Sequence, residues 1–300
     1  MPLLREESEK LSNNQLVAGV VDEIIERDDL FAVLPFTGVN GKAYVYDREE
    51  TLSEGEFLDP NEPVPEGAAT FTEHIAKLRI LAGDVDVDKF LQTTMSDTNN
   101  QMAIQVAKKA KGLARKFHRT LAQGNATTNP KEFDGLPRLV SADQSIAAGV
   151  DGNALTLTMM DELCDAVPNG ADVIVMRRGT IRAYRNLLRL QNGNDGAIQQ
   201  LENFGRPMLT HNGIPIIMNE FLLGNEVQGA NANTCSVYAM RLNEADGLHG
   251  LFGGDTAGIV VENLGTVQNK DAWRIRLKWY VSMALKSTKS LARIRGVTNI

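Results

Sequence analysis

The chain has 300 residues, 43% of them hydrophobic and 23% charged, which is an ordinary composition for a globular protein. This length allows one large domain or two modest domains with a buried core. No apolar run approaches the roughly 20 residues of a membrane span, and the N-terminus lacks the features of a secretory signal. Two cysteines, Cys164 and Cys235, are too few for a disulfide framework and are typical of a reducing compartment.

Charge is distributed unevenly within a formal net charge of −7. Residues 1–100 carry 21 acidic and 8 basic side chains, whereas residues 101–300 carry 17 acidic and 23 basic ones. No acidic residue follows Asp271. An acidic first third and a basic remainder predict contact between copies of the chain, with the basic part of one copy on the acidic part of another.

The first part of the chain predicts an arm. Residues 11–27 carry apolar side chains at helical spacing, so we expect a short amphipathic helix, and Pro35 stops any helix that follows. Little beside this helix in the sequence offers it a packing surface. We therefore expect the arm to dock elsewhere in the chain or on a neighbouring copy.

An extended acidic loop follows the arm. Residues 38–49 predict a strand, and residues 49–71 are strongly acidic, rich in proline and poor in aliphatic side chains. A loop of this length inside a compact domain is unusual, so it is expected to be functional or disordered. Strand character returns over residues 75–90.

Residues 97–123 predict one long helix. Apolar side chains recur along it at spacings of three and four, from Met102 to Leu121, and stack on one face. Asp97 is the predicted N-cap, and Gly124 stands where a C-terminal glycine is expected. Steps of about 100° per residue place four bases on the opposite face: Lys108, Lys111, Arg115 and Arg119. Such a face is either an ordinary solvated surface or a surface turned toward a polyanion.

From Ser141 onward, helix and strand patterns alternate, which predicts a mixed α/β region. The glycines of residues 250–258 predict a turn, because no lysine or helix start follows them as a phosphate-binding loop requires. The predicted helices are 156–166 and 180–190, and the predicted strands are 171–177, 213–220, 234–242 and 254–265, followed by two long strands within 272–297.

The sequence lacks the patterns of the common catalytic and cofactor sites. It contains no GxGxxG, no GxSxG and no histidines at metal-ligand spacing. An Asp–His pair within residues 246–250 has no candidate nucleophile. The three aspartates of 84–88 resemble the start of a calcium loop, but Lys89 and Met95 stand where that loop needs glycine and glutamate. We therefore expect no enzyme, no cofactor and no metal, and a strand with three carboxylates on one face.

Taken in order, the elements resemble the major capsid proteins of tailed bacteriophages, of the Hong Kong 97 type. In that family an N-terminal arm leads into an extended two-stranded E-loop, and a long spine helix lies on a peripheral P-domain. A central A-domain follows, and the chain returns to the P-domain sheet near the C-terminus. The segments that carry the resemblance are DDLFAVLPF and NGKAYVYDRE before the loop, the helix at 97–123, EFDGLPRL after it, and NKDAWRIRLKWYVSMAL near the C-terminus.

The resemblance implies an α+β fold of the Hong Kong 97 type, with an extended E-loop hairpin, a P-domain built from a long spine helix and a long β-sheet, and an α/β A-domain. The implied division is an N-terminal arm at 1–36, the E-loop at 37–76, the P-domain at 77–140 with its spine helix at 97–123, the A-domain at 141–254, P-domain return strands at 255–286, and a C-terminal A-domain strand at 287–300.

The resemblance also implies contact residues. We expect the acidic E-loop to lie on the P-domain of a neighbouring copy, against bases of the spine helix or of the strand at 274–289. The expected contact residues of the loop are Glu54, Glu56, Phe57, Leu58, Asp59, Glu62 and Glu66. The expected inner-face bases, turned toward packaged DNA, are Lys108, Lys111, Arg115 and Arg119. Such bases bind phosphate without reading sequence.

Two departures from the family pattern matter. Some members carry a long N-terminal scaffolding extension, but only residues 1–10 precede the arm helix here, so a separate scaffolding protein is implied. Some members cross-link the subunits of their shells with isopeptide bonds from an E-loop lysine to a P-domain asparagine. Between Lys42 and Lys77 this chain has no lysine, so we expect a shell held by non-covalent contacts, with a cement protein as a candidate helper.

The expected function is that of a structural major capsid protein. It would self-assemble into pentamers and hexamers of the icosahedral shell around the double-stranded DNA of a tailed bacteriophage. The expected partners are other copies of itself, a scaffolding protein, a portal, a cement protein and non-specifically bound DNA, with no membrane. The expected location is the virion, after assembly in the host cytoplasm. The alternatives are an encapsulin-type compartment shell, which shares the fold, and a soluble α/β enzyme with an unrecognised site.

Overall fold

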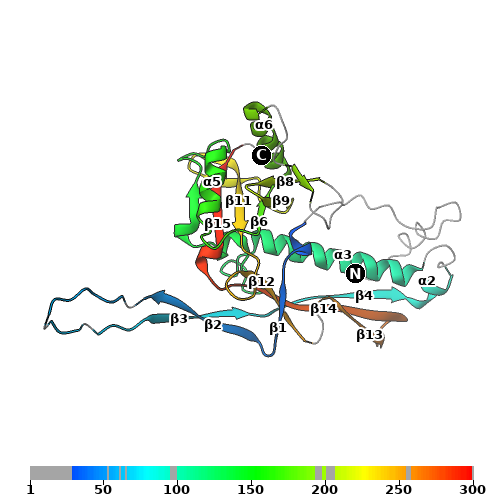
Figure 1. Cartoon of the computed structure of the whole chain (residues 1–300). Helices are drawn as coiled ribbons and strands as arrows, with labels where there is room; N and C mark the ends of the chain where they lie inside the picture. Colours follow the sequence, from blue (N-terminus) through cyan, green and yellow to red (C-terminus); the bar gives the residue numbers. More distant parts are fainter. Residues whose placement is uncertain are drawn as a thin grey trace.

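The described chain forms two sheets, a long helix between them and a projecting hairpin (Figure 1). The predicted arm helix at 11–27 and the predicted N-cap Asp97 lie outside the described residues. The computed structural model describes residues 29–52, 54–60, 62–64, 66–94, 100–192, 198–200, 207–254 and 258–298.

A five-stranded sheet forms the lower layer in Figure 1. Its central strand is β14 (Ala272–Leu285), the long strand predicted near the C-terminus, and it pairs antiparallel with β4 (Arg79–Asp88) along one edge. Along its other edge, β14 pairs first with β13 (Val260–Thr266) and then with β12 (Leu248–Gly253). β1 (Phe36–Val39) pairs parallel with β12 and is the last strand on that side.

The two faces of this sheet differ because β14 alternates between apolar and charged side chains. Ile275, Leu277 and Trp279 are buried under the long helix, while the bases that alternate with them lie on the opposite face. On β4, Val85 and Val87 lie on the buried face, as the alternation of aspartate and valine predicted.

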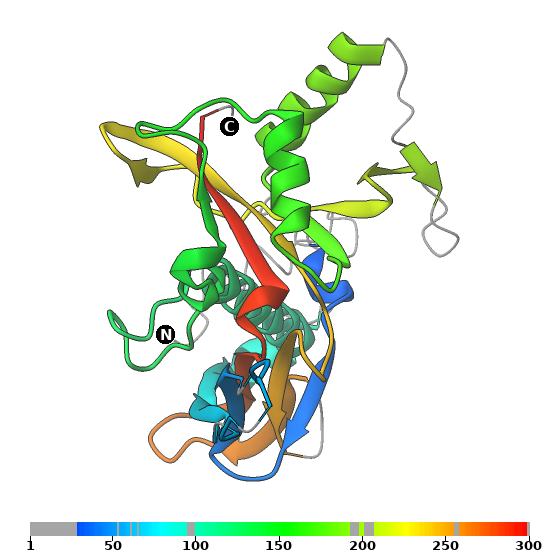
Figure 2. The ribbon, with the colours of Figure 1, turned by 60° about the vertical axis from the view of Figure 1, so that its left-hand side comes forward.

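The buried face of the sheet is covered by α3 (Gln101–Gln123), the predicted spine helix (Figures 1 and 2). Leu113, Phe117 and Leu121 are buried on it at the predicted spacing. The Phe117 ring centroid lies 4.7 Å from that of Trp279 on β14. This apolar stripe holds the helix on the sheet, because packing the two together removes apolar side chains from water.

The helix begins later than the sequence predicted. Asn100 is the N-cap, and its side-chain oxygen accepts a hydrogen bond from the Ala103 N–H at 3.0 Å. An asparagine satisfies an unpaired N–H of the first turn as an aspartate does, so cap chemistry did not distinguish the two positions. At the other end, Gly124 is the C-cap, as predicted, and its N–H donates to the Thr120 carbonyl at 2.6 Å.

An eight-stranded sheet forms the upper body, above the C-terminal half of α3 in Figure 1. Helices α5 (Leu157–Asp165) and α6 (Arg178–Asn192) contribute side chains to its core, which confirms both helices predicted for this region. The strand order is β5 (Ser145–Ala147), β15 (Leu291–Val297), β11 (Asn231–Met240), β6 (Val173–Met176), β9 (Ile214–Met218), β8 (Pro207–His211) and β7 (Ile198–Gln200), with β10 (Glu226–Gln228) paired to β11.

β2 (Ala43–Thr51) and β3 (Thr70–Lys77) form a separate two-stranded hairpin that projects from the body (Figure 1). The described residues between the two strands belong to no helix or strand. This is the extended hairpin that the sequence predicted. The remaining short elements are 3₁₀ turns at Leu30–Ala32, Ala142–Gln144 and Thr288–Ser290, and the helices α2 (Lys89–Thr94) and α4 (Leu136–Leu139).

Strand pairing corrects one predicted turn and two predicted boundaries. The sequence predicts a turn at 250–258, but most of strand β12 lies there. The strand was not predicted because its glycines carry no side chain that could show the alternation of a strand. β12 also falls in the range predicted for the A-domain, 141–254. β1 reaches into the range predicted for the E-loop, 37–76. Their partners place both strands in the five-stranded sheet.

We expect Phe117→Ala to lower the free energy of unfolding by about 3–5 kcal/mol, because it empties the contact between α3 and β14. Urea unfolding of unassembled subunits, followed by tryptophan fluorescence, measures the loss. Lys131→Ala, in an exposed loop, is the control and should change the free energy of unfolding by less than about 0.5 kcal/mol. A Phe117→Ala effect as small as that of the control would contradict the packing role.

Candidate subunit-contact surfaces

The described residues of the hairpin tip, which spans 52–69, include exposed acidic and exposed apolar side chains. All five acidic residues predicted for the contact are exposed, as are Phe57 and Leu58. The Asp59 N–H donates to a Glu62 carboxylate oxygen at 2.9 Å, and the Glu62 N–H donates to the Asp59 carbonyl at 3.1 Å. The tip therefore presents a closed turn with carboxylates beside a fully exposed aromatic ring.

The strands of the hairpin also carry exposed apolar side chains. Val45, Phe71 and Ile75 are each more than half exposed. A two-stranded hairpin is at best marginally stable alone, and exposed apolar side chains gathered on one element mark an interaction surface. The strands of the hairpin therefore have the character of an interaction surface.

The four predicted inner-face bases lie on the side of α3 turned away from the sheet. Lys108, Lys111 and Arg119 are exposed, and Arg115 is half-buried. Lys116, beside them, forms an ion pair with Glu132 at 2.5 Å. The structure brings the four bases onto one helix face, as the sequence predicted.

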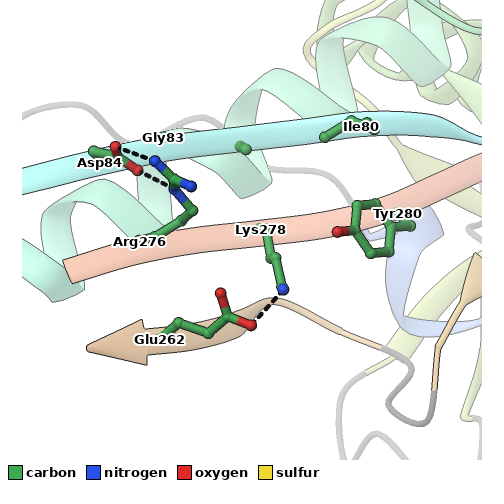
Figure 3. A pocket seen from close by; sticks show the side chains of 8 residues that line it. Ile80, Gly83, Asp84, Glu262, Arg276, Lys278 and Tyr280 are labelled. Carbon is green, nitrogen blue, oxygen red and sulfur yellow. Dashed lines mark hydrogen bonds and ion pairs between the residues drawn. The ribbon is translucent and has the colours of Figure 1, made fainter. Parts of the chain in front are cut away.

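The outer face of the five-stranded sheet carries a ladder of ion pairs (Figure 3). Arg276 donates two hydrogen bonds of 2.8 Å to Asp84, and Arg274 donates two of 2.6 and 2.7 Å to Asp86. Lys278 pairs with Glu262 on β13. We expected bases of the spine helix or of β14 to contact the E-loop of a neighbouring copy. Three of the β14 bases are instead paired within their own subunit.

These pairs shift the pKa values of the carboxylates. Hydrogen bonds from Arg276 and Arg274 lower the pKa of Asp84 and Asp86, respectively, below their ordinary value of 3.8. The same bonds raise the pKa of both arginines. Two of the pairs, Arg276 with Asp84 and Lys278 with Glu262, line a shallow hollow of about 500 Å³, which Ile80 also lines (Figure 3).

The root of the hairpin is clamped to the end of β14, a feature that the sequence did not predict. The Tyr46 hydroxyl donates to the Leu285 carbonyl at 2.8 Å. Arg48 donates to the carbonyls of Leu285 and Lys286, both at 2.7 Å. The only signal in the sequence was that Arg48 is the sole base between Tyr44 and His74.

The histidines have structural surroundings. His74 stacks on Tyr46, and His249 packs edge-on against Tyr44. Asp246 bonds to Arg241 rather than to His249, so the Asp–His pair considered at 246–250 does not form. Within the described ranges, no three His, Cys, Asp or Glu side chains gather as a metal site.

The cysteine thiols are not activated. Burial, and then the charge of Asp161, raise the pKa of the Cys164 thiol to about 11. Burial also raises the pKa of Cys235. Both thiols are protonated at neutral pH, whereas a nucleophilic cysteine needs a lowered pKa.

A family model described as SU10 major capsid protein matches residues 78–267, well over half of the chain. The chain belongs to this family. The match covers β4, α3, most of the eight-stranded sheet and β13. It identifies the chain as a shell-forming major capsid protein, the function predicted from the sequence. No curated protein sequence matches the chain.

Solved structures share the fold over almost the whole capsid protein. The SrpI encapsulin of Synechococcus elongatus has 18% identity and a TM-score of 0.75, with 99% of this chain and 97% of that chain covered. The capsid of an empty GTA particle has 13% identity and a TM-score of 0.69, with 98% of each chain covered. A chain of Mycobacterium phage Bobi has 14% identity and a TM-score of 0.64, with 98% of each covered. These likenesses confirm the predicted Hong Kong 97-type fold class.

The helices of the capsid protein carry no membrane signal. Among the described residues, no helix combines the length and the apolar character that crossing a bilayer requires.

We expect Asp86→Asn to flatten the acid dependence of subunit stability. Because the pKa of Asp86 is lowered in the folded state, its stabilisation is complete above about pH 4 and is lost as the pH falls through the folded-state pKa. The neutral amide of the variant would remove this contribution at all pH values. Thermal unfolding between pH 2.5 and pH 7 measures it, with Asp143→Asn, an exposed acid outside the sheet, as the control. Parallel curves for Asp86→Asn and the unmodified protein would contradict the assignment.

Proposed function

We propose that this capsid protein forms pentamers and hexamers of the icosahedral shell of a tailed-phage virion, with double-stranded DNA inside. Its structural role follows from its family. The observation that carries the finer proposal is the projecting hairpin, which is acidic and apolar at its tip and meets its own body at its root. An element of this kind is stabilised by a neighbouring copy.

The hairpin tip is proposed to contact the P-domain of the neighbouring copy through Glu54, Glu56, Phe57, Leu58, Asp59, Glu62 and Glu66. Exposed ion pairs contribute only about 0–1 kcal/mol each, so the carboxylates set the register of the contact. Burial of an aromatic side chain contributes about 1.5–3 kcal/mol, so Phe57 supplies more of the affinity. The bases on β14 are engaged in their own subunit, which favours bases elsewhere as partners.

The other partners are proposed from the charge pattern and from the chemistry of the hairpin. Lys108, Lys111, Arg115 and Arg119 form one basic face of α3, which suits the phosphates of packaged DNA. The hairpin segment between Lys42 and Lys77 has no lysine that could form an isopeptide cross-link, so the shell is held by non-covalent contacts. A separate scaffolding protein, a portal and a cement protein complete the proposed assembly, which takes place in the host cytoplasm.

An encapsulin-type compartment is the second candidate. The TM-score of 0.75 to the SrpI encapsulin, over nearly the full length of both chains, supports it. At 18% identity this likeness concerns the fold alone, whereas the family match favours the virion. Electron microscopy of purified particles, with nucleic-acid and protein analysis of their contents, separates the two. Particles filled with a cargo enzyme and free of DNA would favour the compartment.

We expect Glu56→Lys with Glu66→Lys to lower the yield of closed particles by about tenfold or more, because like charges would meet at the contact. Sedimentation and negative-stain microscopy of purified assemblies measure the yield. Glu162→Lys with Glu244→Lys makes the same charge change at exposed positions of the A-domain and is the control. Equal yields of closed particles from the two double variants would contradict the proposed tip contact.

We expect Lys111→Gln with Arg119→Gln to reduce the salt dependence of DNA binding by unassembled capsomers. Each lost phosphate contact should lower the slope of log affinity against log salt by about 0.9. Anisotropy of a labelled duplex, titrated at several salt concentrations, gives the slope. Lys131→Gln with Lys289→Gln is the control, since both bases are exposed and lie off this face. An unchanged slope would argue against a DNA-facing helix.

A further inference from the structure

A second hollow, of about 430 Å³, lies where the hairpin joins the body. Its walls come from the hairpin root, the start of β4, the loop after α3, α4 and the end of β14. We call it the root pocket. One carboxylate, that of Asp134, lines it, together with His74 and four bases: Arg48, Lys77, Arg79 and Arg138.

The positive charge of the root pocket is not neutralised within the described part of the subunit. Arg48 is held in place by backbone carbonyls, which carry no net charge. Arg138 donates only to the Thr127 hydroxyl, at 3.3 Å. None of the four bases forms an ion pair among the described residues. The Asp134 carboxylate accepts instead from the Ala126 N–H at 3.0 Å.

One donor in the root pocket is both buried and unused. The Nε of Arg79 is out of contact with solvent and, among the described residues, has no hydrogen-bond partner. A buried polar group left unpaired is destabilising, so a carboxylate that bonded to it would satisfy the unused donor and form a charge-assisted hydrogen bond. Burial, and then the charge of Arg48, lower the pKa of His74, which fits a pocket of positive potential.

The hollow on the outer sheet face shows the contrast (Figure 3). Its bases and acids pair with one another, Arg276 with Asp84 and Lys278 with Glu262. The charges that line this hollow balance one another, so they cannot select a charged partner. The root pocket, in contrast, carries an excess of positive charge that can select an acidic partner.

We propose that the root pocket binds the acidic hairpin tip of a neighbouring copy of this chain. The tip offers Glu54, Glu56 and Glu66, which are exposed, and no base lies between Arg48 and His74 to oppose them. This inference rests on the proposed tip contact and names its receptor. It moves the receptor from the bases of β14, which are already paired, to the hairpin's own root.

The two ends of one hairpin are therefore complementary to each other, since the tip is acidic and the root is basic. Complementary patches at different places on one subunit make a head-to-tail contact, and such contacts close into rings when the rotation between neighbours allows it. Each subunit gives one tip and receives one. Because Arg48 is bonded to the end of β14, a tip bound at Arg48 would be linked to the central strand of the five-stranded sheet.

A charge swap tests the pairing. Lys77→Glu with Arg138→Glu reverses the root at two exposed positions, and Glu56→Lys with Glu66→Lys reverses the tip. We expect each double variant to lower the yield of closed particles by about tenfold or more, and the fourfold variant to recover most of it. Lys131→Glu with Lys289→Glu is the control for the root. Thermal unfolding of unassembled subunits checks that every variant folds.

The outcomes separate this inference from the proposed function. If tip reversal lowers the yield but root reversal does not, or if the fourfold variant fails to recover, the tip binds another surface and the root pocket is excluded. If tip reversal has no effect, the proposed tip contact itself fails. A disulfide between copies in particles of Glu56→Cys with Arg138→Cys, absent from either single variant, would support the pairing independently.

Discussion

The packing of α3 on β14 is the contact on which the rest of the subunit depends. Phe117 and Trp279 meet at its centre, and the same buried cluster extends to Val175 and Tyr238 of the eight-stranded sheet. One core therefore joins both sheets to the helix. Because protein interiors are close-packed, a change at this contact is transmitted to both domains.

The hairpin has the opposite character. Its strands pair only with each other, and its root is fixed by side chains that reach the carbonyls at the end of β14. The body is stabilised by its own core, whereas the hairpin leaves apolar side chains such as Phe57 and Phe71 exposed. A subunit built in this way has a buried core of its own and an element that leaves its apolar side chains exposed, which suits a shell protein.

Local periodicity predicted much of this fold. The spacing of apolar residues in α3 and the alternation in β4 and β14 each report which face of an element is buried, and neighbouring residues suffice to read them. Strand β12 was not predicted, because its glycines have no side chain that could report a buried face. The basic helix face follows from the same periodicity, whereas the acidic tip was predicted from the composition of residues 49–71.

The sequence by itself determined the long elements, their buried faces and the separation of charge between the hairpin and the rest of the chain. Only the tertiary structure decided which charges remain available to a partner. Asp84 meets Arg276 across 192 positions and Arg48 meets Leu285 across 237, distances that no local pattern spans. The register between β4 and β14 neutralises Arg274 and Arg276, and Glu262 of β13 neutralises Lys278. The junction of hairpin and body leaves the bases of the root pocket without an ion-pair partner among the described residues.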